Sequence, residues 1–130
     1  MLVHFPIVFW SCALAADVAA VVAQAPLAAT VASATLALGC ATGLLAMIAG
    51  ILDFVGVAKD SPAREPAVAH LMAMCGAWLI FLMALAMHGY PPVPVVSVVA
   101  LLTTVVGFVT MAIGGWLGGK LVYQFKIGSV

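Results

Sequence analysis

Charged side chains are scarce in this sequence. Lysine and arginine together number 4, aspartate and glutamate number 4, and charged residues make up 6% of the 130. The formal net charge is zero, so the chain lacks the basic surface that binds nucleic acid. The hydrophobic content of 67% and the mean hydropathy of +1.34 exceed what a water-soluble protein carries. The composition therefore indicates an integral membrane protein in contact with the lipid bilayer.

Motifs of phosphate binding, nucleophilic catalysis and metal chemistry are also absent. The sequence contains no Gly-rich phosphate loop, no His-Glu-x-x-His and no Gly-x-Ser-x-Gly. Cys12, Cys40 and Cys75 are too far apart for a Cys-x-x-Cys pair, and we expect each to pack as a small apolar side chain. These absences favour an electron-transfer or structural subunit over a stand-alone catalyst.

Charge-free segments predict how often the chain crosses the membrane. Residues 66–119 carry no charge, and one helix of that length would be roughly 80 Å long against a hydrocarbon core of about 30 Å. The break is expected at residues 89–94, which read Gly-Tyr-Pro-Pro-Val-Pro, because proline lacks the amide donor. A second turn is expected at the Gln-Ala-Pro of residues 24–26, and residues 58–66 form a polar loop.

We therefore predict a single all-α transmembrane domain over residues 1–130, an up-down-up-down four-helix bundle with both termini on the same side. Its spans lie near residues 3–24, 30–57, 67–88 and 94–117, followed by a C-terminal tail at 118–130. No Lys or Arg precedes the first span, so we read it as a span and not as a removable signal peptide. All Lys and Arg then lie on the side of the termini, which the positive-inside rule makes cytoplasmic.

Helical spacing predicts which faces point into the bundle. Residues three and four apart share a face, and small side chains there let helix backbones approach closely in lipid. Residues 114–119, Gly-Gly-Trp-Leu-Gly-Gly, are either a hinge into the tail or a surface on which a flat group presses against bare backbone. The predicted inner faces of the second, third and fourth spans are Gly39, Gly43, Ala46, Gly50 and Asp53; His70, Met74, Ala77, Phe81, Ala84 and His88; and Ala100, Thr104, Gly107, Met111, Gly114 and Gly118.

Polar residues gather at two depths of the predicted bundle. The threading brings His4, Asp53 and His70 to the cytoplasmic edge at similar depth, either as a functional group or as a hydrogen-bond network at the interface. The opposite side carries Asp17 and His88. Asp17 is either a protonated side chain bonded to a neighbouring helix or part of a proton relay with His88, and His88 otherwise reads as a helix cap or interface residue.

Both ends of the chain resemble a known family. Residues 2–7 (LVHFPI), 50–53 (GILD), His70 and 114–123 (GGWLGGKLVY) are similar to DUF2231, a bacterial family of small four-span membrane proteins of unknown function. The resemblance covers nearly the whole chain and implies a multi-pass protein of the bacterial inner membrane. Some members are joined to Rieske-type iron–sulfur domains, which implies electron transfer. The tail here lacks the histidine with which the family's closing motif continues.

Three functional hypotheses follow. Neutral imidazoles from two helices at one depth can ligate iron from both faces, so the first is a redox protein or redox-complex subunit that holds haem b. His4 and His70 would be the axial ligands, and Asp53 would accept the free ring N–H of one histidine. The second is a cofactor-free scaffold or anchor subunit. The third is a proton or metal-ion pathway: the two histidines and the carboxylate suit a divalent metal, and Asp17 and His88 could continue a proton relay across the membrane. Redox partner subunits or further copies of the chain are the expected protein partners.

Overall fold

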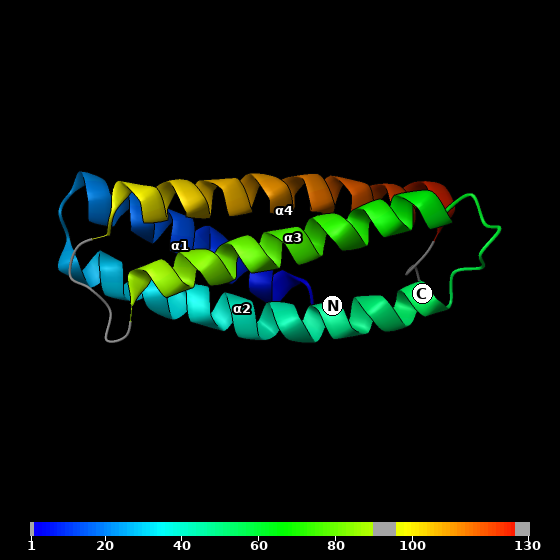
Figure 1. Cartoon of the computed structure of the whole chain (residues 1–130), viewed down its shortest axis with the longest axis horizontal. Coiled ribbons are helices and arrows are strands. Elements are labelled where there is room, and N and C mark those ends of the chain that lie inside the picture. The colour runs from blue at the N-terminus through cyan, green and yellow to red at the C-terminus, as the bar shows by residue number, and fades with distance from the viewer. Residues whose placement is uncertain (1, 90–95, 127–130) are drawn as a thin grey trace.

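The part of the chain that the structure describes folds into four long helices (Figure 1). A computed structural model describes residues 2–89 and 96–126. Helix α1 comprises His4–Val22, α2 Pro26–Val55, α3 Arg64–His88 and α4 Val98–Phe125. Each is long and apolar enough to span a membrane. Large apolar side chains cover the outside of the bundle, as expected where lipid is the solvent.

The helices run alternately up and down, and α1 begins and α4 ends nearer the end of the bundle that carries the α2–α3 connection (Figure 1). Helix α1 packs chiefly on α2 and α3 chiefly on α4, and the pairs α2–α3 and α1–α4 close the ring. Helices α1 and α3 therefore face each other across the bundle axis. The predicted all-α four-helix bundle is confirmed.

Local sequence explains where the helices begin and end. Gln24 adopts a left-handed conformation with φ 53° in the turn after α1, and Pro26 begins α2, where its missing amide costs nothing. The Ser97 side chain caps α4 by accepting a hydrogen bond from the Ala100 amide at 3.1 Å. The predicted break at residues 89–94 lies largely outside the described residues, but α3 does end at His88, directly before it.

The prediction placed several helix ends differently. Helices α2 and α3 begin at Pro26 and Arg64, earlier than the expected residues 30 and 67, and α4 begins at Val98, later than the expected residue 94. Helix α4 continues to Phe125, so residues 118–125 are helix and not tail, and the hinge reading of residues 114–119 is wrong. Lys120 can remain on the helix because its ammonium group lies over the Trp116 ring, 4.6 Å from the ring centroid.

The core depends on aromatic rings that lie against glycines. The Trp10 ring stacks on Phe81 from the opposite helix, with ring centroids 4.3 Å apart and planes at 10°. A Cβ atom added at Gly39 would come within 2.4 Å of the Trp10 ring, and one at Gly107 within 3.1 Å of the Phe81 ring. The predicted inner faces of α3 and α4 are buried or half-buried, whereas on α2 Gly39 and Gly43 are buried but Gly50 and Asp53 are exposed. The glycines at 39 and 107 leave room for the rings.

Candidate functional site

Two polar centres lie at opposite ends of the bundle, and one of them borders a cavity. Helix α1 has 19 residues and α2 has 30, which at about 1.5 Å per residue makes α1 roughly 16 Å shorter. The interior beyond the start of α1 is therefore less completely filled. A cavity of about 470 Å³ lies there, lined by parts of all four helices and by residues next to them. Its size falls within the range of about 300–1,000 Å³ typical of small-molecule sites.

His70 is the histidine in the cavity wall. Its Nδ1 atom lies 2.8 Å from the carbonyl oxygen of Gly114 on α4. A carbonyl oxygen only accepts, so Nδ1 must donate, and in the neutral ring Nε2 then carries the lone pair. Nε2 has no hydrogen-bond partner among residues 2–89 and 96–126. This is the arrangement by which proteins orient a histidine for metal ligation.

Glycines on α4 and α2 shape the wall around His70. A Cβ added at Gly118 would come within 2.9 Å of the His70 ring, so glycine allows the imidazole to lie against the helix backbone. Gly50 and Gly115 also line the cavity, and a Cβ added at either would meet no atom within 4 Å. The wall therefore contains bare backbone beside open space, which suits a flat, apolar ligand.

The structure brings together two of the three residues predicted at this end. Asp53 and His70 both line the cavity. His4 is exposed and is not among the lining residues, although Val3 and Pro6 on either side of it are. Asp53 does not bond to the His70 ring: the partner is the Gly114 carbonyl. Asp53 was predicted to accept from one of the two histidines, and for His70 the backbone carbonyl on α4 takes that place.

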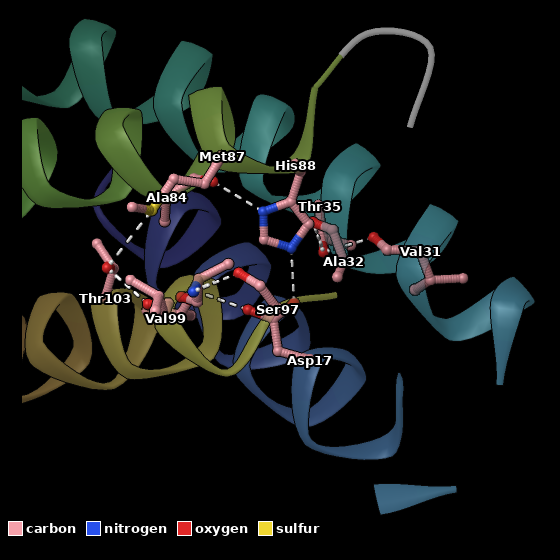
Figure 2. A network of polar contacts seen from close by, with 12 residues as sticks. Asp17, Val31, Ala32, Thr35, Ala84, Met87, His88, Ser97, Val99 and Thr103 are labelled. Carbon is pink, nitrogen blue, oxygen red and sulfur yellow. Dashed lines mark hydrogen bonds and ion pairs between the residues drawn. The ribbon is translucent and has the colours of Figure 1, made fainter. Parts of the chain in front are cut away.

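The opposite end holds a closed polar centre on three helices. Asp17 of α1, His88 of α3 and Thr104 of α4 are 0%, 2% and 0% exposed. The Asp17 carboxylate lies 2.8 Å from His88 Nε2 through Oδ1 and accepts a hydrogen bond of 2.7 Å from the Thr104 hydroxyl through Oδ2. His88 Nδ1 donates to the Ala84 carbonyl at 2.7 Å (Figure 2).

Sequence reasoning joined Asp17 and His88 as a possible proton relay but did not connect Thr104 with them. Asp17 and His88 were predicted on one side of the membrane, and Thr104 on the inner face of its helix. The interpretation of His88 as an interface residue is wrong, since its ring is buried, whereas the cap interpretation agrees with the bond from Nδ1 to the Ala84 carbonyl in the last turn of α3. Gln24, in the turn after α1, is exposed and takes no part in this centre. The signal in the sequence was that Asp17, His88 and Thr104 are all polar, face inward and lie at one depth of the predicted bundle.

The stacked rings lie between the two centres. Trp10 precedes Asp17 by seven residues on α1, and Phe81 precedes His88 by seven on α3, so each ring lies two turns nearer the cavity. Trp10 also lines the cavity and closes its inner side. Within the described ranges, no group of three His, Cys, Asp or Glu side chains is placed to hold a metal ion.

Comparison with protein families agrees with this architecture. The model of a family described as predicted membrane protein (DUF2231) matches residues 1–130. The chain belongs to this family. No curated protein and no solved structure matches the chain. Membership of DUF2231 supports the multi-pass membrane character that the four helices show, and the family's description names no activity.

Proposed function

We propose that this DUF2231 protein binds a b-type haem in the cavity and serves as a small redox protein or redox-complex subunit of the bacterial inner membrane. The proposed orientation puts both termini and the α2–α3 connection in the cytoplasm. All Lys and Arg of the chain belong to that end, in line with the positive-inside rule.

One observation carries the proposal: the cavity wall contains a histidine whose Nδ1 is held by a backbone carbonyl and whose Nε2 has no protein partner in the described chain. Haem iron binds a neutral imidazole through such a nitrogen. The second support is the fit of a flat ring. Gly50 and Gly115 leave open space beside their backbones, and most of the remaining lining residues are apolar.

The chain's own groups would each have a defined part. When bound, haem supplies one-electron chemistry. His70 would ligate the iron, and the Gly114 carbonyl would fix its ring orientation and raise its basicity. Trp10 would close the inner side of the site and keep water out of the core. Asp53, exposed at the rim of the cavity, is placed to meet polar substituents of the ligand or the solvent beside them.

His4, the second predicted ligand, would be the other residue to hold the haem. Val3 and Pro6 line the cavity while His4 does not, so His4 would have to reorient at the start of α1 to reach the iron. Separate substitutions of His4 and His70 distinguish the contribution of each histidine to haem binding. In His4→Ala we expect haem to remain bound with an altered spectrum, and in His70→Ala we expect it to be lost.

The test is an absorption spectrum of the protein purified in mild detergent from haem-replete cells, recorded as dithionite-reduced minus oxidised. Near-stoichiometric Soret and alpha bands in the wild type that disappear in His70→Ala would support the proposal. Bands that survive in His70→Ala would remove His70 as the ligand. A wild-type protein without bands would contradict haem binding and favour the cofactor-free anchor subunit, which should then copurify with a partner.

A further inference from the structure

The Asp17–His88–Thr104 centre is closed on every side by its own hydrogen bonds. Thr104 donates to Asp17 Oδ2 at 2.7 Å and also lies 3.2 Å from the Ala100 carbonyl of its own helix. Both ring nitrogens of His88 and both carboxylate oxygens of Asp17 have partners. The three side chains are essentially inaccessible. A buried ionisable pair in a membrane segment is costly unless its members compensate each other.

The geometry fixes how many protons this centre contains. His88 Nδ1 faces a carbonyl oxygen, which cannot donate, so Nδ1 carries a proton. The 2.8 Å contact between His88 Nε2 and Asp17 Oδ1 then requires one proton between the two atoms. If there were no proton between these two atoms, the lone pair of Nε2 would face a carboxylate oxygen and the two would repel each other. If there were two protons, an imidazolium N–H would face a carboxylic acid, and the buried pair would carry a net positive charge.

We propose that Asp17 and His88 form a proton-binding site that holds one shared proton in the membrane interior. The proton lies either on His88, as an imidazolium beside a carboxylate, or on Asp17, as a carboxylic acid that donates to a neutral imidazole. In both forms the pair is neutral overall. The bound proton allows the pair to connect α1 with α3 across the bundle axis, and Thr104 attaches α4 to the same carboxyl group.

The site is separate from the proposed haem cavity, since the Trp10–Phe81 stack lies between them. It does not depend on haem binding, and its test uses the protein without added ligand. The inference would therefore survive a failure of the haem proposal, and the haem proposal would survive a failure of this one.

The direct test counts the proton by two spectroscopies on the folded protein in detergent. Isotope-labelled histidine reports by NMR which ring nitrogens of His88 are protonated, and the signals of the three histidines are assigned by elimination with His4→Ala and His70→Ala. Infrared spectra report whether Asp17 is a carboxylic acid. The acid band is assigned by isotopic labelling of aspartate and by elimination with Asp53→Asn and Asp60→Asn, which lie at the other end of the bundle.

Two results support one proton: a doubly protonated His88 ring without an Asp17 acid band, or a ring protonated at Nδ1 alone together with that band. A ring protonated at one nitrogen without an acid band, or at both nitrogens with one, would overturn the proposal. A second measurement compares melting temperatures. Asn at position 17 can donate to a neutral His88 and accept from Thr104, so Asp17→Asn should melt well above Asp17→Leu, and equal melting temperatures would contradict the inference.

Discussion

The two inward-facing histidines of α3 show how one residue type acquires two roles in this bundle. His70 and His88 lie on one face of the helix, and each directs Nδ1 to a backbone carbonyl, of Gly114 at 2.8 Å and of Ala84 at 2.7 Å. They differ at Nε2. The Nε2 atom of His88 bonds to Asp17, whereas that of His70 has no partner in the described chain. Asp17 on the short α1 bonds to His88 at one end, whereas at the other end, beyond the start of α1, Asp53 lines the cavity without bonding to the His70 ring. Helix length thus separates a closed polar centre from a cavity that can bind a ligand.

The largest expected effect comes from removing one member of the closed pair. His88→Leu or Asp17→Leu leaves its partner buried and unpaired, which should lower the free energy of unfolding by about 3–5 kcal/mol. The double variant should recover most of this loss, because two leucines fill the space without a buried charge and the Thr104 hydroxyl can turn its proton to the Ala100 carbonyl, 3.2 Å away. Reversible unfolding in mixed micelles measures the cycle. Losses that simply add would contradict the coupling between the two residues.

Trp10 tests the separation between the two ends. Trp10→Ala removes the ring that stacks on Phe81 and closes the inner side of the cavity. The expected loss is about 3 kcal/mol, at the lower end of the range for Trp→Ala because the ring already borders a cavity. Trp116→Ala is the matched control, since Trp116 is 63% exposed and Trp10 is 1% exposed. Equal effects of the two substitutions on the unfolding midpoint would contradict a core role for Trp10.

Thr104 contributes a single hydrogen bond to the closed centre. Thr104→Val should lower the free energy of unfolding by about 2 kcal/mol, because Asp17 Oδ2 loses its only donor in the described chain. Thr110→Val on the same helix is the control. Its hydroxyl donates only to the Val106 carbonyl of its own helix, so its removal should change stability by less than about 0.5 kcal/mol. Reversal of this order in the same unfolding assay would rule out the assigned role of Thr104.

The cavity end is tested with two glycines of α4. A Cβ added at Gly115 or Gly119 meets no atom within 4 Å, but only Gly115 lines the cavity. Gly115→Leu should therefore weaken haem binding at least tenfold, about 1.4 kcal/mol, while Gly119→Leu should leave it unchanged. Haem titration of the apoprotein, followed at the Soret band, measures both. Equal affinities in the two variants would place the ligand elsewhere.

Much of the fold could be predicted because lipid restricts the choices. The long charge-free run and its prolines located the turns, and residues three and four apart identified faces such as Gly39 with Gly43. The end of α4 was misplaced because glycines at residues 114–119 resemble a break in water-soluble proteins, whereas this helix continues across them to Phe125.

The candidate site was less predictable for a different reason. Helical spacing gives the direction of a side chain but not the partner it meets. The pairing of Asp17 with His88 depends on α1 and α3 lying opposite each other across the axis, and the acceptor for His70 is a backbone carbonyl that any residue at position 114 would supply. The cavity results from the unequal helix lengths, and the predicted span limits were too imprecise to show it.

The most direct test of the central claim, that His70 ligates haem in the cavity, is chemical rescue of His70→Gly. The substitution removes the imidazole and leaves its space, so we expect the purified variant to lack the haem bands of the wild type and to regain them when free imidazole and haem are added. Haem bands in His70→Gly without imidazole, or no recovery with it while the wild type binds haem, would contradict the claim.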